Sequence, residues 1–184
     1  MAETGEETQT PSSEGRSDDE RIADIMEAFH KRLQEEGLKS TKQRDLIVDQ
    51  AAFFEKYRSV KPFMINDEPV AAGERLQSQA QRMQFDDTTN CILCASCYSA
   101  CPVLEDNSAF IGPAAIAQAF RFNADTRDRG FQQRLPALDH ADGVWPCQNH
   151  FKCTQACPRS ILITKRINQT KRMIEKHNSR DTDT

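Results

Sequence analysis

The sequence predicts a mostly α-helical domain that is built around cysteine ligands and has polar segments at both ends. Apolar residues recur at helical spacing in several stretches, and no stretch alternates apolar and polar residues as a half-buried strand would. All seven cysteines lie between Cys91 and Cys157. Only 38% of the 184 residues are hydrophobic and 28% are charged, so we expect bound ligands to contribute to the folding of the domain.

Residues 1–44 differ in composition from the rest of the chain. The first 18 residues are rich in Glu, Ser, Thr and Gly and contain one basic residue, Arg16, which predicts a disordered acidic tail and not an Arg-rich mitochondrial transit peptide. Ser17 and Glu20 can form a capping box. An amphipathic helix over residues 18–36 is predicted from the spacing of Ile22, Ile25, Met26, Phe29 and Leu33. Its apolar stripe could pack on the domain or dock on another subunit.

The predicted domain spans residues 45–176 and begins with a helix that Asp45 can cap. This helix carries its apolar residues at helical spacing, namely Leu46, Ile47, Ala51, Phe53, Phe54 and Tyr57. Pro62 and Pro69 indicate loops, and a short helix is expected around Gln77–Met83.

Two more helices are predicted within and after the cysteine-containing region. Pro113 suits the first turn of a helix through Phe122. The small residues of this helix allow close approach to a bound group, and they are Ala114, Ala115, Ala117 and Ala119. The last helix is expected to start near Ile161 and to carry Ile163, Ile167 and Ile174. Its expected end is marked by cations that complement the helix dipole, Lys171, Arg172 and Lys176, and residues 177–184 are predicted to be a polar tail.

The cysteines form two groups whose spacing points to iron-sulfur clusters. The first group, Cys91, Cys94, Cys97 and Cys101 followed by Pro102, has the bacterial ferredoxin spacing, in which three thiolates bind one cluster and the fourth binds another. The second group is Cys147, Cys153 and Cys157, followed by Pro158, with His150 where a fourth cysteine would stand. By the same crossover, the expected 4Fe-4S ligands are Cys91, Cys94, Cys97 and Cys157. A second cluster would bind Cys101, Cys147 and Cys153, which suggests 3Fe-4S unless His150 supplies a fourth ligand.

Other uses of the cysteines and other partners fit the sequence less well. A disulfide framework would need an oxidising compartment and usually an even number of cysteines, and a structural zinc site normally uses two separated pairs. The net charge of −4, without a basic stripe, argues against a nucleic-acid partner. No apolar run approaches the length of roughly 18 residues that a membrane span requires.

Four motifs resemble the iron-sulfur subunit of succinate dehydrogenase and quinol:fumarate reductase. They are CILCASCYSACP from Cys91, FIGPAAIAQAFRFNADTRD from Phe110, GVWPC from Gly143 and CTQACPR from Cys153. The resemblance begins near Asp45 and continues to about residue 176. It implies an α-helical, bacterial-type two-cluster ferredoxin domain with the same division of the cysteines between a 4Fe-4S and a 3Fe-4S cluster.

The resemblance also implies a set of partners. The family's usual N-terminal 2Fe-2S domain would show Cys-x4-Cys-x2-Cys and a distant fourth cysteine, and nothing before Cys91 matches it. A split subunit of the kind found in some protist mitochondria would supply that domain as a separate polypeptide, docked on residues 1–44. The other expected partners are a flavoprotein subunit, membrane anchor subunits and quinone. The implied location is peripheral, on the matrix side of the mitochondrial inner membrane.

The resemblance is weaker at the quinone end. Pro102 matches a residue that lines the family's quinone pocket, and Lys171 stands where fumarate reductases have a lysine near their quinol. Gln148 replaces a family histidine, while Glu105 and Asp106 occupy the region of a family tryptophan. The candidates for the quinone vicinity are Pro102, Asp106, Gln148, His150 and Lys171, and each can also be interpreted as a surface residue.

The predicted function is a stepwise relay of single electrons from a partner flavin and 2Fe-2S cluster, through the 4Fe-4S and 3Fe-4S clusters, to quinone. The complex could also run in the opposite direction, as a fumarate reductase. No residue of this chain is expected to be catalytic, because the dicarboxylate chemistry belongs to the flavin. The alternative is a soluble electron-transfer module of another oxidoreductase, such as a heterodisulfide-reductase-like subunit, although such modules usually keep two complete four-cysteine groups.

Overall fold

The computed structural model describes residues 50–70 and 73–181, together with residues 20, 23, 24, 27, 28, 31 and 35. The chain divides into two units, residues 1–40 and 41–184. In the first unit the described positions are helical and exposed. The acidic tail, Asp45 and the apolar stripe predicted within residues 18–36 lie outside the described residues, so these predictions and the boundary at residue 44 stay predictions.

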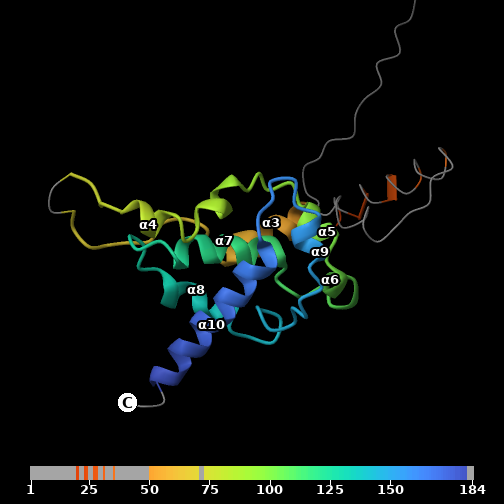
Figure 1. Ribbon diagram of the computed structural model, residues 1–184. Coiled ribbons are helices and arrows are strands. Elements are labelled where there is room, and N and C mark those ends of the chain that lie inside the picture. The colour runs from red at the N-terminus through yellow and green to blue at the C-terminus, as the bar shows by residue number, and fades with distance from the viewer. Residues whose placement is uncertain are drawn as a thin grey trace, which may run out of the picture. The chain divides into compact units, whose positions relative to one another are not determined.

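The described part of the second unit is built of helices and loops, as predicted, and has no strand (Figure 1). Its central element is helix α7 (Pro113–Asn123), whose residues 113–120 are all buried. Helices α3 (Gln50–Ser59), α8 (Phe131–Leu138) and α10 (Ile163–Asp181) pack against α7. Seven of the first eight residues of α7 are apolar, so this part of the helix must be covered around its circumference, which explains why α7 lies in the middle.

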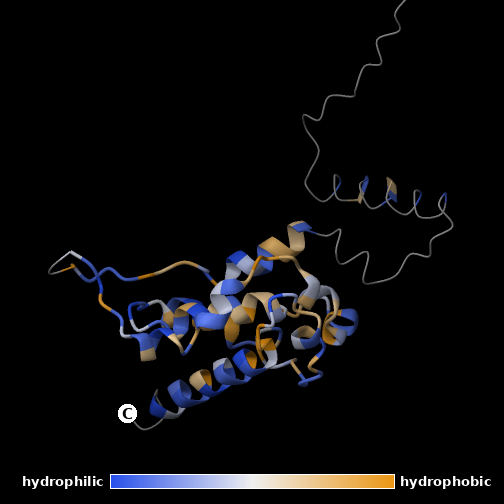
Figure 2. Ribbon diagram, turned by 45° about the horizontal axis from the view of Figure 1, so that its top comes forward, coloured by the Kyte–Doolittle hydropathy of each residue, from blue (hydrophilic) through white to orange (hydrophobic). Residues whose placement is uncertain are grey.

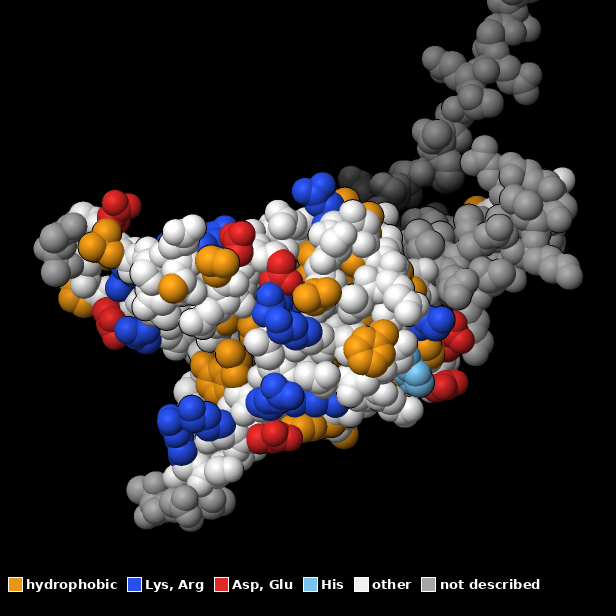
Figure 3. All heavy atoms as spheres, viewed as in Figure 1, with side chains coloured by type: hydrophobic (Ala, Val, Ile, Leu, Met, Phe, Trp, Pro, Cys, Tyr) orange, Lys and Arg blue, Asp and Glu red, His pale blue; other side chains and the backbone are white. Residues whose placement is uncertain are grey.

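Helix α10 is amphipathic and covers one side of α7. Ile163, Ile167 and Ile174 are at most 3% exposed and belong to the main core, while Lys165 and Arg172 lie on the exposed side. Figure 2 shows apolar residues recurring among mostly polar ones along this helix. Figure 3 shows Lys and Arg side chains gathered where α10 lies, with acidic and apolar side chains nearby.

Two predicted helices occur close to their expected bounds. Helix α4 (Gln79–Arg82) is capped by Ser78, which accepts a hydrogen bond from the Gln81 amide while the Gln81 side chain accepts one from the Ser78 amide. Helix α7 begins at Pro113, as predicted, and ends at Asn123. Pro62 and Pro69 lie in the loop region between α3 and α4.

The last helix is longer than the sequence suggested. Helix α10 starts at Ile163 and continues through Asp181, so the predicted end near Lys176 was wrong and Lys171 lies inside the helix. Contacts with the α8 region stabilise the extra turns. The His177 ring lies 5.5 Å from the Phe131 ring, and Asn178 donates a hydrogen bond of 2.9 Å to Asp139. Such tertiary contacts cannot be inferred from a local charge pattern.

Helix α8 contains Pro136 and was not predicted. It is held by Arg134, which is fully buried and uses all five N–H groups of its guanidinium. Two go to the Asp128 carboxylate, at 2.7 and 2.9 Å, and one goes to the Asn123 side chain at 3.1 Å. The other two reach the backbone carbonyls of Lys61 and Phe63 at 3.1 and 2.7 Å. Arg134 therefore connects α8 to the loop that follows α3.

The remaining helices of the described chain are short. They are η1 (Asp86–Asn90), α5 (Ser96–Ser99), α6 (Pro102–Asp106) and α9 (Lys152–Gln155). Among the described residues, no helix is long and apolar enough to cross a membrane.

Candidate functional site

The two cysteine groups lie on loops with the same backbone conformation. In the first loop Leu93 and Ala95 have φ angles of 53° and 57°, and in the second Asn149 and Phe151 have 60° and 61°. In each loop these are the second and fourth residues after the first cysteine. The first loop leads into α5 and the second into α9, and these two helices are in contact. The second loop is thus a structural repeat of the first, in which His150 takes the position of Cys94.

Left-handed backbone at four residues other than glycine is a functional signal. Each such residue costs of order 1–3 kcal/mol, and the cost is tolerated mainly at binding sites. Turns of this type can present successive N–H groups to one concave side, a feature of many iron-sulfur and phosphate sites. The conformation of both loops therefore suits an anionic group with cysteine ligands.

The first hollow is lined by the sulfur-bearing residues Cys91, Cys94, Cys97 and Cys157, and its volume is about 400 Å³, including open space at its mouth. Ala114 and Ala117 of α7 form part of its wall, which fits the predicted role of small residues there. Ala115 and Ala119 are buried in the core around α7 and do not line this hollow.

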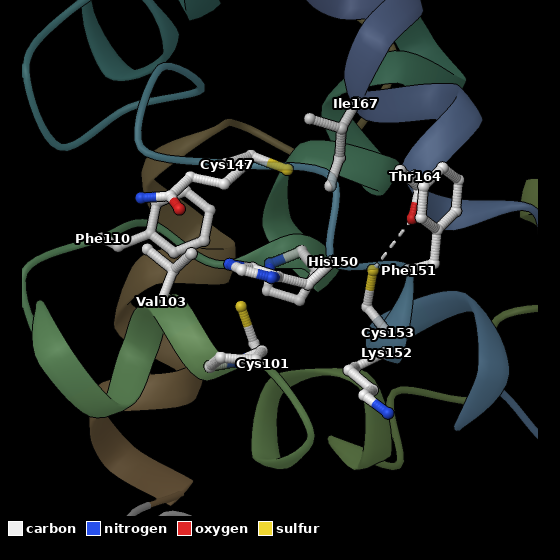
Figure 4. Close-up of a pocket in the computed structure, with 13 residues that line it drawn as sticks. Cys101, Val103, Phe110, Cys147, His150, Phe151, Lys152, Cys153, Thr164 and Ile167 are labelled. Atoms are coloured by element: carbon white, nitrogen blue, oxygen red, sulfur yellow. Dashed lines mark hydrogen bonds between the residues drawn. The ribbon is translucent and has the colours of Figure 1, made fainter.

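The second hollow is lined by Cys101, Cys147 and Cys153, and its volume is about 300 Å³ on the same measure. Figure 4 shows these cysteines around it, with the His150 ring among them and Val103, Phe110 and Ile167 as apolar walls. Three of the candidates for the quinone vicinity also line this hollow, namely Pro102, Gln148 and His150. Asp106 does not line it and is exposed at the end of α6.

The first residues of α7 and α10 separate the two hollows. Pro113 lines the second hollow and the next residue, Ala114, lines the first. Ile163 lines the first hollow and the next residue, Thr164, lines the second. Each helix therefore begins in the wall between the hollows, and the two hollows lie back to back.

The environment of the buried thiols disfavours the thiolate form unless a metal binds. Burial raises the pKa of Cys97, and neighbouring thiols raise it further, namely Cys91, Cys153, Cys157 and Cys94. Burial is also the main cause of the raised pKa of Cys101 and of Cys153. Thiols of this kind stay protonated at neutral pH unless a metal binds and deprotonates them.

The cysteine lining of both hollows suits iron-sulfur clusters. Among the residues that the structure describes, no three Cys, His, Asp or Glu side chains converge on the position of a single metal ion. In an iron-sulfur cluster each thiolate binds a different iron, so the cysteines stand apart around the group. The residues of both hollows fit such clusters in chemistry, because thiolates are their usual ligands.

Side-chain hydroxyls contact one sulfur in each group. The Ser96 hydroxyl lies 3.3 Å from Cys94 Sγ, and the Thr164 hydroxyl lies 3.4 Å from Cys153 Sγ. Thr154 in turn contacts Thr164. Sequence analysis did not identify these residues. Ser96 and Thr154 could have been noticed because they are close to cysteines in the chain, but Thr164 approaches Cys153 only through folding.

Lys171 contacts the second cysteine loop directly. Its Nζ donates a hydrogen bond of 2.9 Å to the Cys147 carbonyl and lies 6.0 Å from the centre of the Trp145 ring. The interpretation of Lys171 as a solvated helix-terminal residue is therefore wrong, because the side chain holds the loop that carries Cys147. Trp145 belongs to the GVWPC motif, and its role beside Lys171 was not predicted.

Comparisons with known proteins agree with this arrangement. Residues 87–161 match the family described as 4Fe-4S dicluster domain. The chain is 38% identical over 130 residues to the fumarate reductase iron-sulfur subunit of Escherichia coli, covering 70% of this chain and 53% of the relative. It is 41% identical over 125 residues to the succinate dehydrogenase iron-sulfur subunit of Coxiella burnetii, covering 67% and 53%. It is 43% identical over 120 residues to the fumarate reductase iron-sulfur subunit of Mycobacterium tuberculosis, covering 64% of this chain and 49% of the relative. The chain thus spans about half the length of the curated relatives it matches.

Proposed function

We propose that this chain, which is homologous to the iron-sulfur subunits of fumarate reductase and succinate dehydrogenase, transfers electrons within a complex of that class. The observation that carries the proposal is the pair of adjacent hollows, one lined by four cysteines and the other by three. Clusters bound in them would accept and pass on single electrons, which is the chemistry that thiolate-bound iron supplies.

The cysteines of the first hollow, Cys91, Cys94, Cys97 and Cys157, would hold a 4Fe-4S cluster. Those of the second, Cys101, Cys147 and Cys153, would hold a 3Fe-4S cluster. His150 repeats the position of Cys94 but offers imidazole in place of thiolate. We propose that it is not a ligand and that it lies beside the cluster, where it can supply a proton to quinone.

The protein residues around the second hollow have distinct tasks in this proposal. Lys171 holds the backbone at Cys147 and keeps a cation near the end of the relay. Pro102, Gln148 and His150 line the same hollow as the three cysteines and would therefore lie beside the second cluster, at the end of the relay where quinone is reduced. Asp106 does not line this hollow, and its place in the quinone vicinity stays a prediction.

The proposed partners follow from the relatives, which are iron-sulfur subunits of fumarate reductase and succinate dehydrogenase. A flavoprotein would carry out the dicarboxylate chemistry, and membrane anchor subunits would complete the quinone site. We propose that a 2Fe-2S centre delivers electrons to the first cluster, and that the segment predicted to be amphipathic within residues 18–36 is a docking surface for a partner. This chain would lie peripherally on the matrix side of the mitochondrial inner membrane, bound to those anchor subunits.

The test is the iron content and the EPR spectrum of the native complex, isolated without oxygen. We expect about seven irons bound to this chain, with the signal of an oxidised 3Fe-4S cluster. In His150→Cys the fourth thiolate should convert the second cluster toward 4Fe-4S, with about eight irons and loss of that signal. Lys152→Cys is the matched control, because it adds a thiol at another residue of the same hollow and should leave seven irons.

Two results would contradict the proposal. Zinc without iron in the native complex would exclude the relay. Four irons in the second hollow of the unmodified chain, with His150 bound to one of them, would exclude the assignment of the second cluster while leaving electron transfer intact.

A further inference from the structure

Two threonine hydroxyls form a hydrogen-bonded chain that ends on a cysteine sulfur of the second hollow. Thr154 Oγ1 accepts a hydrogen bond of 3.0 Å from the Thr164 amide. The two hydroxyl oxygens are 3.0 Å apart, and Thr164 Oγ1 lies 3.4 Å from Cys153 Sγ. Figure 4 shows this last contact as a dashed line. Thr164 is 2% exposed and Cys153 is 7% exposed, so water competes little for these groups.

Ligation of iron by Cys153 would fix the direction of this chain. A thiol could donate to Thr164 or accept from it, but a thiolate has no proton and can only accept. The Thr164 hydroxyl must then donate to Sγ. Its oxygen is free to accept from the Thr154 hydroxyl, whose own oxygen already accepts from the Thr164 amide. Each donation strengthens the next, because hydrogen bonds in series polarise one another.

The first hollow has no hydroxyl at the position that corresponds to Thr164. Thr164 is the second residue of α10 and lines the second hollow. The second residue of α7 is Ala114, which lines the first hollow and has no hydroxyl. At this position of the structural repeat, only the second hollow therefore has a side-chain hydrogen-bond donor. Ser96 contacts a sulfur of the first hollow, but Cys94 is exposed, so water can replace that hydroxyl.

We propose that Thr164, oriented by Thr154, donates a hydrogen bond to the cluster-bound Cys153 thiolate and raises the reduction potential of the second cluster relative to the first. This proposal rests on the proposed electron-transfer function. Reduction adds one negative charge to the cluster and its thiolates, and a donor to sulfur stabilises the more negative form more strongly. A higher potential in the second hollow draws electrons from the first cluster toward the quinone end.

The experiment compares Thr164→Val with Thr164→Ser in the intact complex, by redox titration of both clusters monitored by EPR. Valine keeps the shape but removes the hydroxyl, while serine keeps the hydroxyl. In Thr164→Val we expect the ratio of oxidised to reduced second cluster at a fixed ambient potential to rise about tenfold, which is 59 mV for a one-electron couple. Serine should restore most of this shift, and the first cluster should titrate as in the unmodified protein.

Thr170→Val is the matched control. Thr170 is fully buried in the same helix, but its hydroxyl donates to the Arg166 carbonyl and does not line the second hollow. The same substitution there should leave both potentials unchanged. Thr154→Val should shift the second cluster in the same direction as Thr164→Val, because it removes the hydroxyl that orients Thr164 and that also lies within reach of the Cys153 sulfur.

An unchanged potential in Thr164→Val, with the second cluster present, would overturn the proposal. Equal shifts in Thr164→Val and Thr164→Ser would also overturn it, because packing and not the hydroxyl would then be responsible. Retention of the second cluster by serine but not by valine would assign Thr164 to holding the cluster and reject the tuning role. Absence of the second cluster from the unmodified complex would instead refute the proposed function.

Discussion

Arg134→Met should destabilise the protein strongly while leaving the electron-transfer site intact. Arg134 is fully buried, and its partner Asp128 is 2% exposed at the side chain. Without the guanidinium, the Asp128 carboxylate keeps only two donors, the amides of Ile65 and Gly130. The carbonyl of Phe63 would also lose its donor. The substitution therefore leaves the buried Asp128 charge and the Phe63 carbonyl without their Arg134 partner.

The size of the effect follows from the burial of the pair. Removing one member of a buried ion pair costs about 3–5 kcal/mol, because the remaining charge is stranded away from water. The free energy of unfolding of a domain is only about 5–15 kcal/mol. At the middle of this range, a loss from the middle of the range given for the ion pair removes a third or more of the stability. With a urea dependence of about 2 kcal/mol per molar, the midpoint of unfolding should fall by about 1.5–2.5 M.

The assay is urea unfolding of the complex, followed by the loss of cluster absorbance. Glu68→Gln is the matched control, because Glu68 pairs with Arg129 at 3.2 Å with both side chains more than half exposed, and exposed pairs contribute at most about 1 kcal/mol. Combining Arg134→Met with Asp128→Leu should recover most of the stability, because no charge is then stranded. A midpoint for Arg134→Met within about 0.5 M of the unmodified protein would refute the reasoning, on the urea dependence used above.

Two further predictions concern the second cysteine loop and the response to acid. Lys171→Met removes the donor to the Cys147 carbonyl, worth about 1 kcal/mol, so iron of the second cluster should pass to a chelator roughly fivefold faster, whereas Arg172→Met should release it at the original rate. Equal rates in both variants would show that this hydrogen bond does not hold the loop. Burial alone would raise the pKa of Asp125, but the hydrogen bonds and charge of Arg127 outweigh burial and lower it. A lowered pKa gives stability that is present above the unfolded value of about 3.9 and is lost as pH falls through the lower folded value. The unmodified protein should therefore lose more thermal stability between pH 6 and pH 3, values chosen to bracket that window, than Asp125→Asn does, and parallel losses in the two proteins would contradict this assignment.

The parts of the fold that the sequence predicted are those with local causes. Helix α7 has Pro113 in its first turn and an apolar pattern along its length, and both signals act within the helix itself. Cysteine spacing grouped Cys157 with the first three cysteines, and Cys157 does line the first hollow, although its role as a ligand stays a prediction.

The parts that sequence analysis missed depend on contacts between distant segments. Helix α8 contains a proline and is held by the hydrogen bonds of Arg134 to the loop after α3. The contact between Thr164 and Cys153 and that between Lys171 and the Cys147 carbonyl join residues that are 11 and 24 positions apart. No periodicity or motif encodes such pairs, because the intervening chain decides whether the residues meet.

The way in which the wall between the hollows is built limits how much its thickness can change. Pro113 and Ala114 face opposite hollows, and so do Ile163 and Thr164, so each pair spans the wall with one peptide link. Consecutive Cα atoms are about 3.8 Å apart, and conformational fluctuations elsewhere in the protein do not change this distance. The thickness of the wall at these two points is therefore set largely by covalent geometry. If clusters occupy both hollows as proposed, thermal motion should change this part of the wall between them only slightly.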